Sequence, residues 1–377
     1  MPLNAPPLAP RDEAELAAQV AECHRLSRPL RVTGGGTRMP VLALPGQPLT
    51  TRHITGIVTY EPGALTLIVR AGTPVEVVKQ ALAAEGQALA FEPMDHRPLL
   101  GREGVPTIGG MVSANVSGPR RLRAGACRDH LLGVRFIDGR GRIIRNGGRV
   151  MKNVTGMDLG KLLCGAHGTL GILTEVALKT LPMAEAQETL AFPGLSPRAA
   201  VAVFSAALAT PYEVSGAAFH DGTAWLRIEG LGPQLTYRRD RLAALFRDHR
   251  IEVMGAQDSR ALWRDLRDLR HLAGRAGAVW RIFAKPTDAP AIIEALRPLG
   301  GAVSLDWGGG LIWYCGGPDA AAVREASGPG GALLVRAGPD GAGRVFPPEA
   351  PGLSRLSSAL RHTFDPGAIL NPGLMEG

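Results

Sequence analysis

The sequence predicts an α+β protein of two domains, and three observations support this fold class. At 377 residues the chain is too long for one ordinary hydrophobic core. A β-branched run near its start breaks into three successive glycines, in RVTGGGTR at 31–38, which is typical of a turn that closely approaches a ligand. After Pro182 strands alternate with helices, which favours a second unit with a mostly antiparallel sheet. We therefore expect domains at 1–182 and 183–345, followed by a helix and tail at 346–377.

The first domain is expected to begin with a helix over 12–27, because Leu16, Val20 and Cys23 are spaced for one helix face. A strand then leads into the glycine turn. Two β-rich runs follow, ITGIVTY and LTLIVRAG, and the residues EPGA that join them predict a hairpin. The opening of the domain is thus predicted as helix, strand, glycine turn and hairpin.

The next predicted helix, in TPVEVVKQALAAEG, has clear signals at both ends. Thr73 is placed as the N-cap, Pro74 as the first helical residue and Glu76 as the partner in a capping box. Gly86 marks the end of the helix. Its apolar face should pack on the preceding sheet, and consists of Val75, Val78 and Leu82.

The segment at 104–118, GVPTIGGMVSANVSG, is rich in glycine and hydroxyl groups yet too apolar for a solvated loop. Side chains this small allow a large, flat ligand to lie against the backbone. Beyond it, Asp138-Gly139 predicts a second hairpin. A short helix is expected around Asp158 to Leu163, followed by a glycine turn and a strand ending at Pro182.

The second domain is predicted from strands in AWLRIEG, AVWRIFAKP and GALLVRAG that alternate with helices. Those helices are expected around Tyr237 to Asp248, Arg260 to Leu272 and Ala289 to Leu296. A last helix stops before Pro366 and carries one apolar face, made of Leu353, Leu356, Leu360 and Phe364.

The charge pattern argues against a nucleic-acid partner, although the formal net charge is +8. Lysine supplies five of the 42 basic residues, and the arginines are dispersed, with no basic run interleaved with aromatic residues. Solvated surface charge is therefore favoured over a DNA or RNA groove. An acidic protein partner remains an alternative.

The cysteines and histidines predict neither a metal site nor an iron–sulfur centre. The four cysteines are far apart in the sequence, and the nine histidines form no HxxxH or HxH pair. The N-terminus lacks an apolar region, and no apolar stretch reaches the length that spans a membrane. We expect a reduced, cytoplasmic protein without a transmembrane segment.

The bare amides of the glycine turn suit a phosphate, but two familiar phosphate-binding motifs do not fit. The turn lacks the GxGxxG of a dinucleotide-binding Rossmann unit and the acidic residue about twenty positions further on. No Gly-Lys-Ser/Thr follows, which excludes a P-loop. Taken alone, the turn leaves phosphate binding and a plain tight turn equally open.

Five motifs in order decide between these alternatives: GGGTR, TIGGMVSANVSG, RAGACRD, KNVTGMD and GTLGILTE. This set resembles the FAD-binding domain shared by relatives of vanillyl-alcohol oxidase and p-cresol methylhydroxylase (PCMH). The resemblance covers residues 1 to 182 and returns at FDPGAILNPG near the end. Within that family, AVWRIFAKP, LDWGGGLIWYC and GGALLVRAG resemble the FAD-binding subunits of bacterial glycolate oxidases. The resemblance implies a two-lobed PCMH-type FAD-binding domain, a smaller cap domain, and a C-terminal tail that returns to the flavin domain.

The resemblance also implies which residues bind FAD. The amides of Gly34, Gly35, Gly36 and Thr37, with the side chains of Thr37 and Arg38, would hold the pyrophosphate. The flavin and ribityl channel would be lined by Thr107, Ile108, Gly109, Gly110, Ser113, Asn115, Ser117 and Gly118. Further cofactor contacts are expected at Gly125, at Gly168, Thr169, Gly171 and Ile172 beside the adenosine half, and at Asn371 close to the flavin.

Departures from the family pattern limit what it implies about chemistry. The glycine turn has Thr37 and Arg38 where covalently flavinylated relatives have histidine, so we expect non-covalent FAD. His167 stands where many lactate-type relatives have glutamate, and the HxGDGNxH stretch that supplies metal and catalytic histidine is absent. The catalytic residue is therefore unassigned.

The remaining candidates are more consistent with structural roles. His96, His130 and His167 are each expected to be surface or hydrogen-bonded structural histidines. Lys152 is more simply a solvated lysine than a group that stabilises reduced flavin, and Asp158 more simply a helix cap than a proton carrier. Trp307 and Trp313 are expected in the cap core or at a subunit interface.

The function implied is that of an FAD-binding subunit in a glycolate oxidase, which converts glycolate to glyoxylate. Its partners would be a catalytic flavin subunit and an iron–sulfur subunit, and its FAD would accept hydride or relay electrons. Any contact with the inner face of the membrane would run through that complex. The alternatives are a self-sufficient FAD-dependent 2-hydroxy-acid dehydrogenase of the D-lactate type and a non-catalytic scaffold subunit.

Overall fold

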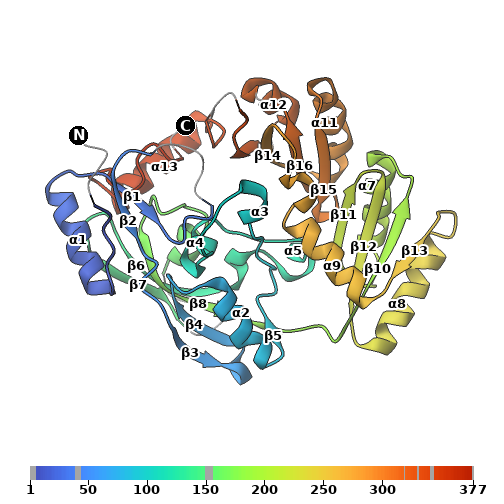
Figure 1. Ribbon diagram of the computed structural model, residues 1–377, viewed down its shortest axis with the longest axis horizontal. Helices are drawn as coiled ribbons and strands as arrows, with labels where there is room; N and C mark the ends of the chain where they lie inside the picture. The colour runs from blue at the N-terminus through green and yellow to red at the C-terminus, as the bar shows by residue number, and fades with distance from the viewer. Residues whose placement is uncertain are drawn as a thin grey trace.

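The computed structural model describes residues 6–38, 44–148, 156–317, 319–328, 331–339 and 344–375. Lys152 lies outside the described residues. The chain forms two domains side by side, and its C-terminal helix returns to the first of them (Figure 1). The α+β fold class is confirmed.

The first domain is built on a five-stranded antiparallel sheet in the order β3-β4-β8-β6-β7. Both predicted hairpins, β3–β4 and β6–β7, are confirmed as neighbouring antiparallel pairs. Strand β8, the last strand of this sheet in chain order, lies at its centre and joins the two hairpins. The strands are β3 (Ile57–Glu61), β4 (Thr66–Arg70), β6 (Leu131–Ile137), β7 (Ile143–Gly147) and β8 (Ile172–Lys179).

A second lobe of this domain combines both ends of the chain. Helix α1 (Glu13–Arg25) begins at the N-cap Asp12 and packs beside the parallel pair β1 (Leu30–Thr33) and β2 (Gln47–Thr50). Leu370 from the tail bridges Leu30 of β1, which confirms the tail's predicted return.

Helix α2 (Val75–Ala84) forms where it was predicted, but its expected capping box is wrong. The hydroxyl of Thr73 accepts a hydrogen bond of 2.9 Å from the amide of Gly56 instead of from the helix. The N-cap is Pro74, which makes no side-chain cap. Thr73 therefore holds the preceding loop in place, because that loop and the helix compete for the same hydroxyl group.

The segment at 104–118, which is rich in small residues, contains one short helix. Helix α4 (Ile108–Ser113) is the one that faces the glycine turn, and α6 (Leu159–Leu163) starts at the predicted cap Asp158. The other short elements are β5 (Gln87–Ala88), α3 (Arg97–Leu100), α5 (Arg121–Ala124) and β9 (Leu181–Pro182).

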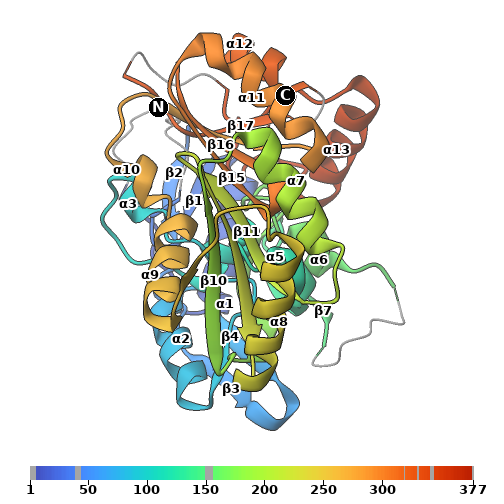
Figure 2. The ribbon, with the colours of Figure 1, turned by 90° about the vertical axis from the view of Figure 1, so that its right-hand side faces the viewer.

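The second domain, the cap, is an eight-stranded antiparallel sheet in the order β13-β10-β12-β11-β15-β16-β14-β17. Helices α7, α8, α11 and α12 cover its outer face, whereas α9 and the first domain cover the inner face (Figure 2). The strands are β10 (Ala186–Pro193), β11 (Val214–His220), β12 (Thr223–Gly230), β13 (Glu252–Met254), β14 (Ala278–Phe283), β15 (Ala302–Asp306), β16 (Leu311–Gly316) and β17 (Ala332–Arg336). The helices are α7 (Pro197–Leu208), α8 (Gly232–Leu245), α9 (Ala256–Arg267), α10 (Arg270–Ala273), α11 (Ala289–Leu296) and α12 (Ala320–Ser327).

The C-terminal helix α13 (Pro351–Phe364) buries only the end of its predicted apolar face. Leu360 and Phe364 pack on the core of the first domain, where the rings of Phe364 and Phe136 lie 6.1 Å apart. Leu353 and Leu356 stay exposed, at 54% and 65%. The first turns of the helix therefore contribute little to the core.

Candidate functional site

The glycine turn and helix α4 face each other across a hollow of about 680 Å³, which we call the nucleotide hollow. Its walls are the turn at 33–38, the start of α4, and the turn and strand at 167–173. The amide of His167 donates a 2.9 Å hydrogen bond to the carbonyl of Ser113, which joins two of these walls. Segments more than 130 residues apart in the sequence are thus brought to one site.

Close packing explains why two of the three turn glycines cannot carry side chains. A Cβ on Gly35 would lie 1.6 Å from the carbonyl oxygen of Val105, and one on Gly34 would lie 2.3 Å from the hydroxyl oxygen of Thr107. Gly36 differs, since it has a φ of +73° and open space where its Cβ would be. Gly36 is therefore needed for its left-handed backbone conformation, and its missing side chain keeps the hollow accessible.

Helix α4 presents its own bare backbone to the hollow. The hydroxyl of Thr107 caps the helix by accepting a 3.3 Å hydrogen bond from the amide of Gly110. Gly109 packs against the adjacent loop, because a Cβ there would lie 2.7 Å from the Cβ of Ala71. Packing thus fixes the small size at Gly109, whereas Gly110 lines the hollow.

The tail closes the hollow through Asn371. Its Oδ1 accepts a 2.7 Å hydrogen bond from the amide of Val32, and its Nδ2 donates a 2.9 Å hydrogen bond to the carbonyl of His167. Asn371 is 1% exposed and adopts a φ of +46°. Asn371 lies behind the wall of the hollow and does not line it. Its side chain connects β1 to the turn at 167–168.

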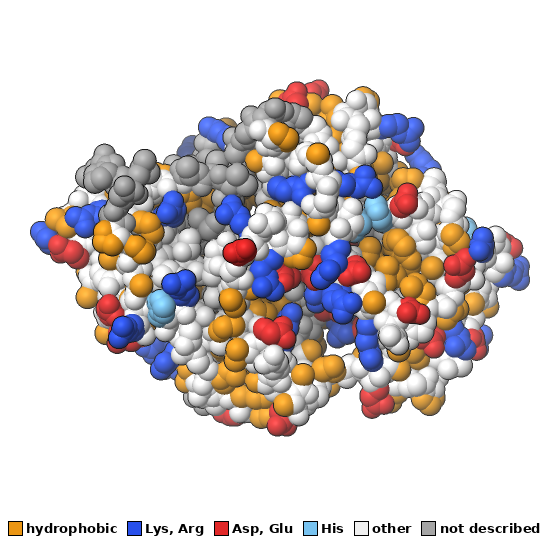
Figure 3. Space-filling model, viewed as in Figure 1, with side chains coloured by type: hydrophobic (Ala, Val, Ile, Leu, Met, Phe, Trp, Pro, Cys, Tyr) orange, Lys and Arg blue, Asp and Glu red, His pale blue; other side chains and the backbone are white. Residues whose placement is uncertain are grey.

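A second hollow, of about 670 Å³, lies between the first domain and the cap, and we call it the cap chamber. It shares Arg38, Ala114 and His167 with the nucleotide hollow, so the two cavities adjoin. The cap contributes Arg281, Trp313 and the strand β17 to its walls. Basic side chains also gather over the middle of the face in Figure 3, where the two domains meet.

Arg38 and His96 form a polar pair on the chamber wall. The Nε of Arg38 donates a 3.3 Å hydrogen bond to Nδ1 of His96, which requires a neutral imidazole acceptor. Burial lowers the pKa of His96 to about 3, and the charges of Arg38 and Arg281 act in the same direction. Burial also lowers the pKa of Arg38 to about 10, so the guanidinium stays charged near neutral pH.

Arg281 is the second cation of the cap chamber. Its guanidinium lies 4.9 Å from the ring centre of Phe283, 5.3 Å from that of Trp307 and 5.8 Å from that of Trp313. Within the described part of the chain, its buried Nε has no hydrogen-bond partner. Burial lowers the pKa of Arg281 to about 10, with the charge of Arg121 adding to the effect. A half-buried guanidinium whose Nε lacks a partner favours an anionic ligand.

His167 borders both cavities. Its ring packs edge-on against Phe346, with ring centres 5.2 Å apart. Burial lowers the pKa of His167 to about 4, and Arg281 adds to this, so the imidazole is neutral at neutral pH. A neutral ring offers one nitrogen as a hydrogen-bond acceptor.

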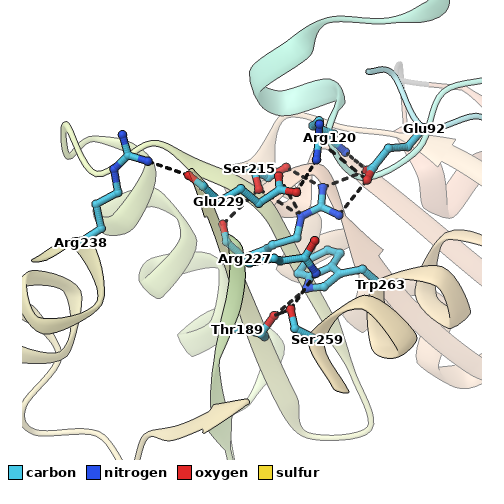
Figure 4. Close-up of polar contacts among 10 residues, drawn as sticks. Glu92, Arg120, Thr189, Ser215, Arg227, Glu229, Arg238, Ser259 and Trp263 are labelled. Carbon is cyan, nitrogen blue, oxygen red and sulfur yellow. Dashed lines mark hydrogen bonds and ion pairs between the residues drawn. The ribbon is translucent and has the colours of Figure 1, made fainter. Parts of the chain in front are cut away.

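A buried ionic network fixes the cap above the chamber (Figure 4). Glu92 accepts two 2.9 Å hydrogen bonds from Arg227 on β12, and Arg120 pairs with both Glu92 and Glu229. Trp263 stacks on the guanidinium of Arg227 at 4.7 Å. The network joins the first domain, β12 and α9, so the chamber walls are held in a defined arrangement.

The structure brings twelve of the predicted cofactor residues to the nucleotide hollow, and Ser117 to the cap chamber. The twelve are Gly34, Gly35, Gly36, Thr37, Arg38, Thr107, Gly109, Gly110, Ser113, Gly168, Gly171 and Ile172.

Six predicted residues lie behind the cavity walls and make structural contacts there. Gly118 accepts a 3.0 Å hydrogen bond from the indole of Trp307, and Asn115 accepts one of 3.1 Å from the amide of Arg128. Thr169 donates to the carbonyl of Ala166. The other three are Ile108 in the core, Gly125 in a turn beside Asp129, and Asn371.

Sequence reasoning missed the residues of the cap chamber. His130 is structural as predicted, with Nε2 2.8 Å from the carbonyl oxygen of Ala124, but His96 and His167 face the chamber. Arg281 was not among the predicted residues. Its place in AVWRIFAKP, a charge alternating with apolar residues on one strand, was the available signal. Trp307 and Trp313 are buried at the domain interface.

The residues of the nucleotide hollow fit an FAD pyrophosphate. The glycine turn leaves amides uncovered, Arg38 supplies a charged donor, and Gly36 leaves open space beside them. Among the described residues no cluster of three or more His, Cys, Asp or Glu side chains is arranged to hold a metal.

Comparisons with known proteins identify the family of this chain. The FAD binding domain family matches residues 7–147. Glycolate oxidase subunit GlcE of Escherichia coli (strain K12) is 35% identical over 364 residues, which are 96% of this chain and 96% of that protein. This chain belongs to the GlcE family. The match to the FAD binding domain and the likeness to GlcE confirm FAD as the predicted cofactor.

Two more distant relatives each match about half of this GlcE-family chain. Glycolate oxidase subunit GlcD of Bacillus subtilis (strain 168) is 33% identical over 48% of this chain and 38% of its own length. The D-lactate dehydrogenase of Archaeoglobus fulgidus is 31% identical over 49% of this chain and 40% of its own. An alkyldihydroxyacetonephosphate synthase structure superimposes with a TM-score of 0.70 at 14% identity, covering 97% of this chain and 76% of that one, which shows the shared fold.

The helices of the described residues are too short or too polar for a bilayer. None combines the length and the apolar character needed to cross one.

Proposed function

We propose that this chain is the FAD-binding subunit of a multi-subunit glycolate oxidase, which oxidises glycolate to glyoxylate. The likeness to GlcE over almost the whole chain supports this assignment. The observation that carries it is the junction of the two cavities at Arg38, Ala114 and His167. A dinucleotide bound in the nucleotide hollow would reach the cap chamber at this junction. The chamber is cationic and therefore suited to an organic acid.

The residues of the chain divide the work between the two cavities. Gly34, Gly35 and Gly36 hold the pyrophosphate through their amides, and Arg38 neutralises its charge from the junction. When bound, FAD supplies a two-electron acceptor for oxidation of an alcohol carbon. The cap lines its side of the chamber mainly with apolar residues, which lowers the polarity around the reacting groups.

The flavin is proposed to be non-covalent, because Thr37 and Arg38 occupy the turn in place of a histidine. Its partners are proposed to be a catalytic flavin subunit and an iron–sulfur subunit. In that assembly the chain holds FAD either where it receives hydride from the 2-hydroxy acid or in the electron path to the iron–sulfur subunit.

Two measurements on the purified chain test the proposal. Its absorption spectrum before and after acid precipitation reports flavin content and covalency, and we expect FAD in the supernatant. Anaerobic glycolate then separates the two roles, since bleaching of the flavin band in the isolated chain supports direct oxidation. Reduction only after the partner subunits are added supports relay. A chain that stays colourless with added FAD would contradict the proposal.

A self-sufficient 2-hydroxy-acid dehydrogenase is the second candidate, favoured because this one chain supplies every wall of the cationic chamber. Turnover of glycolate or D-lactate with an artificial electron acceptor, without partner subunits, would establish it. The scaffold alternative is disfavoured because both cavities keep charged, unobstructed walls.

A further inference from the structure

We propose that the cap chamber binds the carboxylate of a small 2-hydroxy acid, with Arg281 as the carboxylate anchor and His167 as the acceptor of a hydrogen bond from the hydroxyl group. This inference rests on the proposed function, because it assigns the substrate site of that reaction to residues of this chain.

The charge balance of the chamber favours an anion. Arg38 and Arg281 both line it, and no described lining residue is Asp or Glu. Two cations facing one small cavity repel each other, and an anion between them removes that repulsion. Asp306 attracts Arg281 electrostatically, but no ion pair joins the two among the described residues.

Arg281 is the cation that is free to bind. Arg38 already donates to His96, whereas the buried Nε of Arg281 lacks a partner among the described residues. The rings of Phe283, Trp307 and Trp313 surround the Arg281 guanidinium and hold its plane in place. A guanidinium fixed in this way can bind both oxygens of a carboxylate without losing much side-chain freedom.

His167 provides the second contact, since it lines both the chamber and the nucleotide hollow. The neutral imidazole accepts a hydrogen bond, and the hydroxyl of a 2-hydroxy acid donates one. Phe346 and the Asn371 hydrogen bond fix the ring and the backbone of His167, so the acceptor is held at the junction of the two cavities.

The other walls limit the size and polarity of the ligand. Met94, Val116, Leu333 and Val335 are apolar and offer no further side-chain donors. On this side of the chamber we therefore expect the ligand to carry small apolar groups rather than further charged ones.

The test is a binding titration of the FAD-loaded chain with 2-hydroxyisobutyrate and isobutyrate. The hydroxy acid lacks a hydrogen on its α carbon and so binds without being oxidised, and the two acids differ by the hydroxyl group. Tryptophan fluorescence and the flavin absorption band report binding, since Trp313 lines the chamber. The variants are Arg281→Gln, Arg281→Lys and His167→Leu. Arg241→Gln is the control, because Arg241 also stacks on a ring, that of Tyr237 at 5.1 Å, but lies on exposed helix α8.

We expect Arg281→Gln to weaken both acids by about tenfold or more, because it removes a charge-assisted hydrogen-bond donor. His167→Leu should weaken the hydroxy acid about three- to tenfold and leave isobutyrate unchanged. Arg241→Gln should match the wild type. Wild-type affinity in Arg281→Gln, or a wild-type chain that binds neither acid, overturns the proposal.

If Arg281→Gln does not fold, the titration is made with Arg281→Lys instead. An ammonium cannot bind a carboxylate bidentately, so unchanged affinity in this variant overturns the anchor. The proposed function fails separately. If both acids bind through Arg281 but glycolate never reduces the flavin, with or without partner subunits, the proposed carboxylate site is supported and the proposed oxidation of glycolate is contradicted. If glycolate bleaches the flavin equally in wild type and in Arg281→Gln, the proposed function is supported and Arg281 is not the carboxylate anchor.

Discussion

Glu92 of the first domain accepts two 2.9 Å hydrogen bonds from the guanidinium of Arg227 in the cap, one to each carboxylate oxygen. Although burial opposes ionisation, Arg227 and Arg120 hold the pKa of Glu92 below its ordinary value. Replacing Glu92 with glutamine removes the nearer counter-charge of the buried Arg227 and leaves only Glu229, whose Oε2 lies 3.5 Å from the Arg227 Nε. We expect Glu92→Gln to lower the free energy of unfolding by about 3 kcal/mol, measured by urea denaturation.

Glu294→Gln is the matched control for that prediction. Glu294 pairs with Arg297 on the outside of the cap, where both side chains are more than half exposed. An exposed pair contributes little, so the control should stay close to the wild type. Equal effects in the two variants would show that the interdomain pair has no special role.

Gly36→Ala should weaken FAD binding by about tenfold, equivalent to about 1.4 kcal/mol. Its Cβ would project beside the open amides of the turn, where the structure leaves open space. Gly86→Ala controls for backbone strain, because Gly86 has a similar φ of +64° and open space but lies at the end of α2. Each variant should lose about 1 kcal/mol of stability. Loss of FAD affinity in both, measured by flavin fluorescence titration, would remove the case for a cofactor contact at Gly36.

Asn371→Ala should destabilise the closure of the nucleotide hollow from the tail side. The change leaves the amide of Val32 and the carbonyl of His167 without their shared partner, at a cost of about 2 kcal/mol. Hydrogen exchange at the Val32 amide should speed up, and FAD should dissociate faster. Asn371→Asp keeps the acceptor for Val32, so its Val32 amide should stay protected; rapid exchange there would contradict the assigned contact.

Asp306 predicts a pH dependence of stability. Burial raises its pKa to about 7 from the ordinary value of 3.8, so the folded chain keeps a proton that the unfolded chain releases. Stability should therefore fall as the pH rises from about 4 to about 7 and then level off, by an amount on the order of 4 kcal/mol at 1.36 kcal/mol per pKa unit. The difference in unfolding free energy between wild type and Asp306→Asn isolates this effect from the histidines. A difference that does not change with pH would refute the shifted pKa.

The parts of the fold that depend on neighbouring residues could be predicted from the sequence. Helix α1, both hairpins of the first domain and the start of α6 at Asp158 follow from periodicity, turn residues and caps. The capping box at Thr73 was wrong because a loop seventeen residues away took the hydroxyl. Local signals do not reveal such competition.

The candidate site was predictable only on the side of the first domain. The glycine turn and α4 carry an unusual composition, so their residues could be named. Arg281 reaches the cap chamber through the packing of β14 against residues some 180 positions earlier, and a charged residue on a strand is common. The contacts of Gly118 and Asn115 also depend on distant partners, Trp307 in one case and Arg128 in the other.

The hydrogen bonds of Asn371 to Val32 and His167 set an order on biosynthesis. A ribosome makes the glycine turn first and the residue that fastens it last, after the whole cap has emerged. A growing chain therefore displays its nucleotide-binding segments before they are locked. These two hydrogen bonds can form only after translation has passed residue 371.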